Sequence, residues 1–132
     1  MKIVHTSGKR KRAVARATVR EGTGNIRINK VKLDIFEPSF LRQKIREPLL
    51  IAGDVSNKIN IDVNVYGGGI SSQAAAVRLA IGRALVEWTK NAKLKEELER
   101  YDRQMLVADV RRKEPCKPND SKARKKRQKS YR

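Results

Sequence analysis

Residues 67–73 of the chain read Gly-Gly-Gly-Ile-Ser-Ser-Gln, and residues 74–85 continue Ala-Ala-Ala-Val-Arg-Leu-Ala-Ile-Gly-Arg-Ala-Leu. Glycine adopts backbone angles that other residues avoid, so the three glycines predict a tight turn. In the segment that follows, apolar residues recur at three- and four-residue spacing, which predicts a helix with one apolar face. That face comprises Val77, Ile81, Ala84, Leu85 and Trp88.

This turn is expected to connect a strand to the helix. Residues 58–66 alternate between polar and apolar side chains, which predicts a strand with Ile59, Ile61, Val63 and Val65 on its inner face. Ser71 or Ser72 is expected to cap the helix. The free N–H groups and partial positive charge of a helix N-terminus suit a phosphate. A glycine turn before a core helix explains the same residues without a ligand, and both interpretations can hold together.

The chain is strongly cationic, and its charge is concentrated at the two ends. Its 132 residues carry a formal net charge of +18. Residues 1–20 hold seven Lys or Arg and no acid, and residues 111–132 hold eleven against Glu114 and Asp120. The part between them is nearly neutral. This distribution predicts a polyanionic partner, with nucleic acid first and an anionic membrane surface second.

Several classes of protein are excluded by length and composition. The length suits one domain with a modest core. No apolar run reaches the length of about 18 residues that a membrane-spanning helix needs, and no apolar segment follows the basic N-terminus as in a signal peptide. His5 and Cys116 have no partners at metal-ligand spacing, so we expect no metal, no cofactor and no disulfide. A reducing cytoplasm fits these features.

The N-terminal half predicts further strands and one helix. Residues 11–20 alternate, with Ala13, Ala15, Ala17 and Val19 on one face and Arg12, Arg16 and Arg20 on the other. The arginine face is expected to meet phosphates, although a solvated face is the alternative. A basic loop is expected at 7–12. Residues 26–28 are expected to pair back on the strand as a hairpin, and residues 31–33 to form another strand.

Two helices are expected beside the central one. The first covers residues 38–51, begins at Pro38 and ends near Gly53. Pro48 should break or kink it. Its inward residues are expected to be Leu41, Ile45, Leu49 and Leu50. The second helix covers residues 91–101, with Leu94 and Leu98 as apolar contacts.

From about Val107 onward the chain has almost no apolar residues. A segment of this composition cannot bury enough apolar surface to order itself and is expected to become ordered on a partner. We therefore expect a globular α+β domain at residues 1–106 and an extended basic C-terminal tail at residues 107–132.

Three segments together resemble the S-nine family of small-subunit ribosomal proteins. The first is the glycine pattern at 67–76 with Ala80, Gly82, Arg83, Ala84 and Leu85; the second is the basic block at 8–16; the third is the end of the tail at 123–132. The final residues 129–132 look like the archaeal and eukaryotic form of the family. The resemblance covers nearly the whole chain.

The resemblance implies a small mixed sheet packed by helices, similar to the second domain of ribosomal protein S-five, with a left-handed crossover. It implies a structural constituent of the small ribosomal subunit in the cytoplasm, and no enzyme. Such a protein would bind ribosomal RNA in the subunit head, next to neighbouring ribosomal proteins, and its tail would contact peptidyl-site tRNA.

Carried onto this chain, these expectations give two sets of residues. The residues expected to bind ribosomal RNA are Lys9, Arg10, Lys11, Arg12, Arg16, Gly68, Gly69, Gln73, Arg78, Arg111, Arg112, Lys113, Lys122, Arg124 and Lys125. The residues expected to bind tRNA are Lys126, Arg127, Lys129 and Arg132. Phosphate contacts of this kind position a protein without reading sequence.

Two alternatives are weighed against this interpretation. Residues 68–75 also look like the phosphate loop of small-molecule kinases of the galactokinase and homoserine kinase type. Those kinases are about twice as long or longer, and Asp54, Asp62 and Glu87 show no acid–base spacing. A non-ribosomal protein that binds nucleic acid or a membrane surface is the other alternative. The tail offers only Tyr131 for stacking on single-stranded bases.

Overall fold

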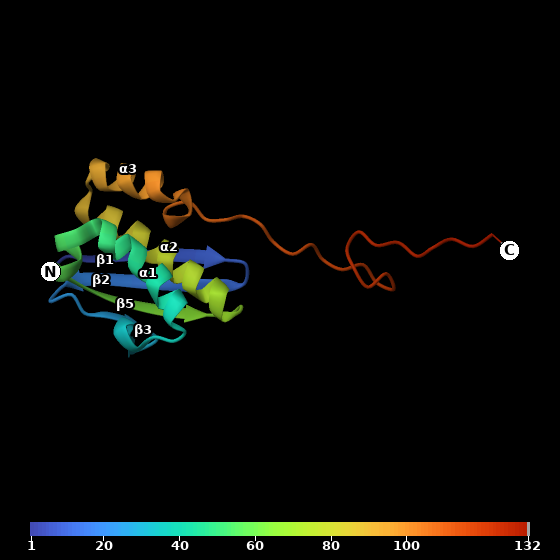
Figure 1. Ribbon diagram of the computed structural model, residues 1–132, viewed down its shortest axis with the longest axis horizontal. Helices are drawn as coiled ribbons and strands as arrows, with labels where there is room; N and C mark the ends of the chain where they lie inside the picture. Colours follow the sequence, from blue (N-terminus) through green and yellow to red (C-terminus); the bar gives the residue numbers. More distant parts are fainter. Residues whose placement is uncertain (132) are drawn as a thin grey trace.

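The strand that precedes the glycine turn lies inside a five-stranded sheet. In the computed structural model, which describes residues 1–131, β5 (Ile59–Tyr66) lies between β2 (Ala13–Glu21) and β3 (Ile26–Ile28). The edges of the sheet are β1 (Ile3–Arg10) and β4 (Val31–Lys32). β1 and β5 both pair antiparallel with β2, β3 pairs parallel with β5, and β4 pairs antiparallel with β3. The chain is thus an α+β protein with a mixed sheet (Figure 1).

The expected hairpin between β2 and β3 is wrong. The two edges of β2 are taken by β1 and β5, each through eight paired residues, so no edge is left for β3. The turn at residues 22–25, which is a different turn from the glycine turn at 67–69, instead crosses over the start of β5. There, the side-chain oxygen of Asn60 accepts hydrogen bonds from the backbone N–H groups of Thr23 and Asn25, each at 3.0 Å. As a result, β3 pairs with the edge of β5 opposite to the one that pairs with β2.

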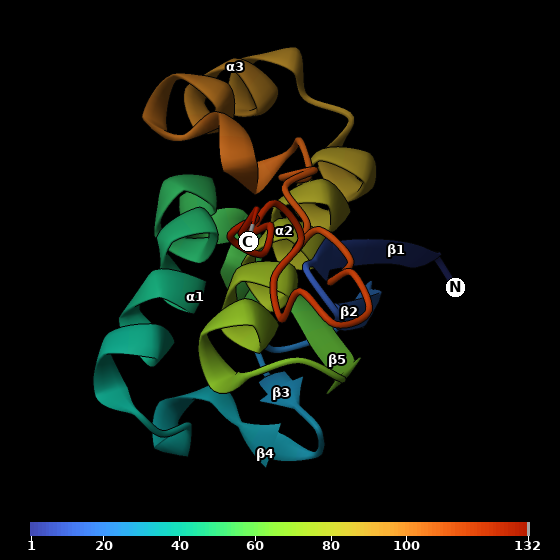
Figure 2. The same ribbon diagram turned by 90° about the vertical axis from the view of Figure 1, so that its right-hand side faces the viewer.

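Two helices cover one face of the sheet. The 3-10 helix η1 (Leu33–Ile35), α1 (Ser39–Ala52) and the 3-10 helix η2 (Gly53–Lys58) connect β4 to β5, and α2 (Ile70–Thr89) follows the glycine turn. Figure 2 shows α1 and α2 side by side over the sheet. α3 (Ala92–Tyr101) packs against both, and the 3-10 helix η3 (Arg103–Met105) follows it. Asn91, the residue before α3, caps the helix because its side-chain oxygen accepts a hydrogen bond from the backbone N–H of Lys93.

Helix α1 differs from its expected form in two ways. It continues past Pro48 to Ala52, and the proline ring is buried. Leu50 is 76% exposed, although it was expected to face inward. The inward face is formed by Leu41, Ile45, Pro48 and Leu49. These positions follow helical spacing, which leaves Leu50 about one-quarter turn further round on the solvent side. Gly53 ends the helix as expected, with a φ of 57°.

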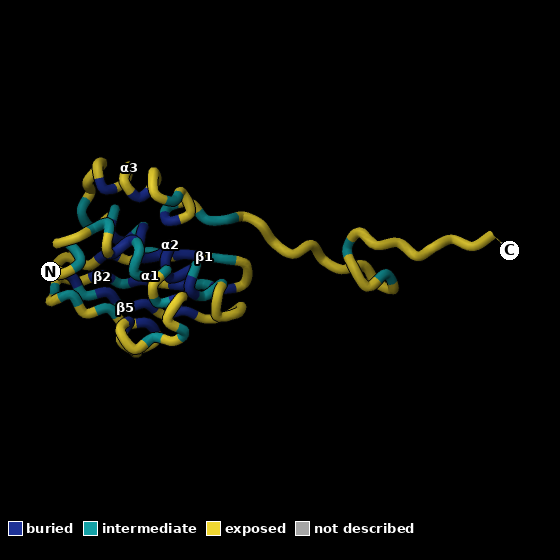
Figure 3. Tube along the Cα trace, viewed as in Figure 1, coloured by how far each residue is buried: buried dark blue, intermediate teal, exposed yellow. Residues whose placement is uncertain are grey.

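The core lies between the sheet and α2 (Figure 3). The inner faces expected for β2 and β5 are confirmed, because the alternate residues from Ala13 to Val19 and from Ile59 to Val65 are buried. Val77, Ile81, Ala84 and Leu85 of α2 are buried against them, and Trp88 is half-buried. The small residues allow close approach. A Cβ on Gly8 of β1 would lie 2.3 Å from the carbonyl oxygen of Ala76.

The two basic ends of the chain differ in form. β1 extends to Arg10, so the expected basic loop at 7–12 is reduced to a turn at Lys11 and Arg12, and Lys11 has a φ of 52°. After η3, the described part of the C-terminal tail, residues 107–131, contains no helix or strand and runs away from the sheet and helices (Figure 1). Most of its residues are exposed (Figure 3).

Candidate nucleic-acid interface

A basic pocket of about 720 Å³ lies at the N-terminus of α2. Three segments that are far apart in the sequence line it: the β1–β2 turn, the glycine turn and the start of the C-terminal tail. All three had been expected to bind RNA. The lining residues are Arg10, Lys11, Arg12, Gly68, Gly69, Ser72, Arg111, Arg112 and Lys113. The structure therefore places six cationic side chains around one hollow.

Glycine is required where the two turns meet. Gly67 and Gly68 have φ angles of 77° and 63°, a region that side-chain-bearing residues rarely adopt. A Cβ on Gly67 would lie 2.6 Å from the carbonyl oxygen of Arg12, and one on Gly68 would lie 3.1 Å from the backbone nitrogen of Ala13. The β1–β2 turn thus packs directly on the glycine turn, which holds its cations beside the helix N-terminus.

The N-terminus of α2 opens toward this pocket without a side-chain cap from the described residues. The expected cap by Ser71 or Ser72 is wrong: α2 begins at Ile70 with Gly69 as its N-cap, so both serines already lie in the first turn. The backbone N–H groups of that turn carry a partial positive charge, which adds to the field of the six side chains. Gln73 donates from Nε2 to the carbonyl oxygen of Gly67 at 3.1 Å and steadies the turn.

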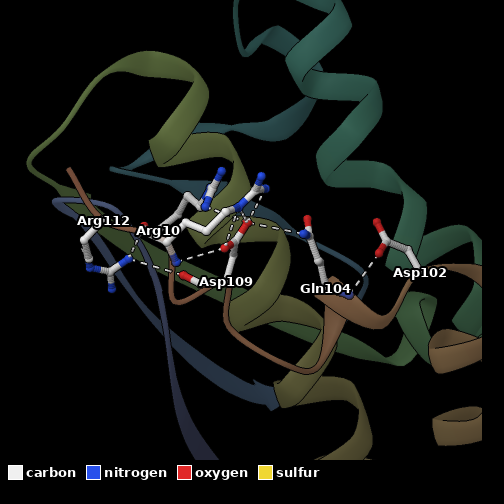
Figure 4. Close-up of polar contacts among 6 residues, drawn as sticks. Arg10, Asp102, Gln104, Asp109 and Arg112 are labelled. Carbon is white, nitrogen blue, oxygen red and sulfur yellow. Dashed lines mark hydrogen bonds and ion pairs between the residues drawn. The ribbon is translucent and has the colours of Figure 1, made fainter. Parts of the chain in front are cut away.

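Asp109 joins the start of the tail to the β1–β2 hairpin (Figure 4). Its carboxylate forms an ion pair with Arg10, with 2.7 Å between Oδ2 and Nη1, and accepts hydrogen bonds from the Arg111 side chain and backbone. Gln104 also donates to Oδ2, at 3.3 Å. The hydrogen bonds from Arg111, together with the nearby Arg10, hold the pKa of the Asp109 carboxyl well below its usual range.

Residues of η3 fix the base of the tail on α2. A Cβ on Gly82 would lie 2.4 Å from the carbonyl oxygen of Met105, so only glycine admits this contact without a shift. Arg83 donates from Nε to the carbonyl oxygen of Leu106 at 3.0 Å and from Nη1 to that of Ser7 at 2.9 Å. One side chain of α2 therefore links β1 to the residue that immediately precedes the tail.

Arg78 was expected to bind RNA, but its side chain is buried inside the domain. It is 5% exposed, and its guanidinium is committed to ion pairs inside the domain, with Glu47 of α1 and with Asp102, at 2.7 Å to Asp102 Oδ2. Burial acts to raise the pKa of Asp102, but hydrogen bonds from Arg78 and from the backbone N–H of Gln104 lower it on balance. Arg78 joins α1, α2 and the α3–η3 connection, and it offers no charge to an external phosphate.

The remaining expected residues lie outside the pocket. Lys9 is exposed near the end of β1. Arg16 is exposed on the sheet face that the helices leave open, with its guanidinium 5.9 Å from the centre of the Tyr66 ring. Along the tail, Arg124 pairs with Glu114 at 2.6 Å and Arg127 donates to the carbonyl oxygen of Asn119. Lys122, Lys125, Lys126 and Lys129 are exposed, and Arg132 lies outside the described residues.

Sequence reasoning missed the residues that assemble the interface. Asp102, Gln104 and Asp109 each make their contacts with partners on other elements as well as locally. The one available signal was the position of Asp109, an acid immediately before the basic run at 111–113. Within residues 1–131, no group of three or more His, Cys, Asp or Glu side chains is arranged to hold a metal ion, and no helix is both long and apolar enough to cross a membrane.

The fold and the site together define a polyanion-binding class of protein, because a small α+β domain directs six cations and a helix N-terminus at one hollow and bears a cationic tail. A family model described as Ribosomal protein S9/S16 matches residues 8–132. The chain is 52% identical to the small ribosomal subunit protein uS9 of Methanococcus maripaludis and 51% identical to that of Methanococcus vannielii, with all of each chain covered in both comparisons. The chain belongs to the ribosomal protein S9/S16 family, whose members are structural ribosomal proteins and not enzymes.

Proposed function

We propose that this protein is a structural constituent of the small ribosomal subunit in the cytoplasm and that its basic pocket holds phosphates of ribosomal RNA. Family membership supports the ribosomal role, and the named relatives are small-subunit proteins. The main observation that supports phosphate binding in this pocket is that the cationic β1–β2 turn and the cationic start of the tail meet at the N-terminus of α2.

The chemistry of the pocket suits a phosphate backbone. Arginine grips phosphate through two parallel hydrogen bonds, and Arg10, Arg12, Arg111 and Arg112 all line the hollow. Backbone N–H groups at a helix N-terminus donate to the same oxygens. Contacts of this kind fix the position of the protein on the RNA and carry no base identity. The interface extends from the pocket to Lys9, Arg16, Gln73, Lys122, Arg124 and Lys125, and it omits the buried Arg78.

The same proposal assigns the tail to tRNA. The domain at residues 1–106 binds in the subunit head beside neighbouring ribosomal proteins, and residues 107–132 reach peptidyl-site tRNA. Lys126, Arg127, Lys129 and Arg132 meet phosphates of that tRNA. Support comes from the exposed cationic side chains of residues 126–129 and from the family resemblance. The left-handed crossover and the likeness to the second domain of ribosomal protein S-five belong to this proposal too.

Hydroxyl-radical footprinting of assembled small subunits tests the pocket. Arg12→Gln and Lys113→Gln each remove one cation from a different segment of its wall. If the pocket holds one stretch of RNA backbone, both variants lose protection at overlapping nucleotides. Lys93→Gln is the control, because Lys93 is an exposed cation on α3, away from the pocket lining. Identical protection in wild type and both pocket variants would refute the proposed site.

A further inference from the structure

Asp109 is the point at which the tail is bound to the rest of the molecule. Its side chain is 9% exposed although it belongs to a segment that is otherwise largely exposed. It meets Arg10 of β1, Gln104 of η3 and Arg111 of the tail. Arg112 also donates to its backbone oxygen, at 3.2 Å. Asp109 thus contacts polar side chains from three parts of the chain, through an ion pair with Arg10 and hydrogen bonds from Gln104 and Arg111 (Figure 4).

Beyond Asp109, the polar contacts of the tail turn inward on the tail itself. Arg124 binds Glu114, and Arg127 binds the backbone of Asn119. Among the described residues, Asp109 makes the last hydrogen bond or ion pair that joins the tail to a strand or helix. The direction in which residues 110–131 leave the domain is therefore set at this carboxylate.

The charge of Asp109 opposes the role of the pocket. Arg10 and Arg111 line the pocket, and a carboxylate between them reduces the positive potential there. A residue that served only to attract RNA would not be an acid at this position. Its contribution must come from holding the two arginines and the tail in a fixed arrangement.

From this geometry we infer that Asp109 is a positioning residue, which joins Arg10 to Arg111 and thereby fixes where the C-terminal tail leaves the domain. The tether itself is independent of the proposed function, whereas its consequence for tRNA rests on that function. Because the tether fixes the direction in which the tail leaves the domain, the tail loses less conformational freedom when it binds tRNA. Its effective concentration at the tRNA is therefore higher.

A spin-label distance measurement tests the tether on the full chain. Cys116 is exposed and is the single cysteine, so it accepts one label beyond the tether. A second label is placed at Ser39→Cys, an exposed position at the start of α1. Asp109→Asn should broaden the distance distribution between the two labels, and Asp109→Glu, which keeps the charge, should narrow it again. Asp120→Asn is the matched control, because Asp120 lies further along the tail and faces Arg127 at 3.9 Å.

Two binding measurements separate this role from general destabilisation. Asp109→Asn removes a negative charge beside the pocket, so the affinity of the free protein for ribosomal RNA should stay equal or rise. Peptidyl-site tRNA affinity of subunits carrying the variant should fall by about two- to tenfold, the scale of the ordering cost of one long side chain. An unfolded variant would lose both affinities and would melt at lower temperature.

The outcomes distinguish the tether from the proposed function. A distance distribution as narrow in Asp109→Asn as in wild type would overturn the inference, whatever tRNA does. A distribution that broadens as much in Asp120→Asn would also overturn it. If Asp109→Asn broadens the distribution while neither it nor removal of the tail changes tRNA affinity, the tether stands and the assignment of the tail to tRNA fails.

Discussion

The α-carbon of Gly67 lies so close to the carbonyl oxygen of Arg12 that a Cβ there would approach that oxygen to 2.6 Å. This contact joins the glycine turn to the β1–β2 turn and so builds two walls of the basic pocket. Gly67 also has a φ of 77°, so both the backbone angle and the available space favour glycine at this position.

Gly67→Ala should lower the free energy of unfolding by about 1–3 kcal/mol through backbone strain, and it should displace Arg12 from the pocket. Thermal unfolding and RNA binding of the purified protein measure the two effects. Gly69→Ala is the control for the stability measurement, because Gly69 has a φ of −96° and, among residues 1–131, nothing lies within 4 Å of a Cβ built there. Equal stability of the two variants would contradict the packing described.

Ile81→Ala should cost ~2–5 kcal/mol of stability, because it removes a fully buried aliphatic side chain and leaves a cavity between α2 and the sheet. Leu50→Ala removes a comparable side chain from α1 but one that is 76% exposed. It should change stability by no more than about 0.5 kcal/mol. Chemical denaturation compares them, and a Leu50→Ala cost as large as that of Ile81→Ala would place Leu50 in the core.

Asp102→Asn should reduce stability at neutral pH and have a diminishing effect as the pH falls. The pKa of Asp102 is lowered in the folded protein, so its charged form is favoured by folding. The contribution is complete above the unfolded-state pKa, near the ordinary value of 3.8, and is lost as the pH falls through the lower folded-state pKa. Unfolding curves of both proteins between pH 7 and pH 2 provide the test. A stability difference that grows in acid would reverse the sign and exclude the Arg78–Asp102 pair as its source.

Removal of residues 129–132 should weaken peptidyl-site tRNA binding to purified subunits and flatten its salt dependence. These residues include Lys129 and Arg132. Each phosphate contact releases counterions and contributes ~0.7–0.9 to the slope of log affinity against log salt, so the slope should fall by about one to two units. Assembly should be unaffected because the core and pocket remain. Unchanged affinity and slope, or a loss confined to one anticodon, would count against tail contact with the tRNA backbone.

Local sequence patterns predict the elements of this fold much better than they predict the partners of those elements. Alternation placed the inner faces of β2 and β5 correctly because a strand repeats every two residues. It could not predict that β3 pairs with β5, since that choice depends on which strand edges are already occupied. Leu49 and Leu50 differ only by their rotation about the axis of α1, so a shift of one position in helix phase exchanges their environments.

For the candidate site, too, the sequence predicts the local segments better than the contacts between them. Runs of Lys and Arg and the glycine turn are visible in the sequence, and the structure brings residues 10–12, 68–72 and 111–113 to one pocket. The roles of the two carboxylates could not be predicted because their partners are distant in the sequence. Asp109 pairs with Arg10, and Asp102 pairs with Arg78. Arg78 lies in a mostly apolar part of α2, and its partners Glu47 and Asp102 are distant in the chain, so the sequence could not predict that its guanidinium is buried in ion pairs.

The position of β5 has a consequence for the order in which the protein forms. β5 joins the β1–β2 hairpin to the β3–β4 hairpin, and it is made after both of them. A nascent chain that ends before residue 59 therefore lacks the strand that joins β2 to β3, and its sheet cannot be continuous. Closing the sheet requires β2–β5 contacts between residues 38 to 52 positions apart, which are slower to form than local ones. The basic turn at Lys11 and Arg12 consequently emerges from synthesis long before the glycines that hold it in place.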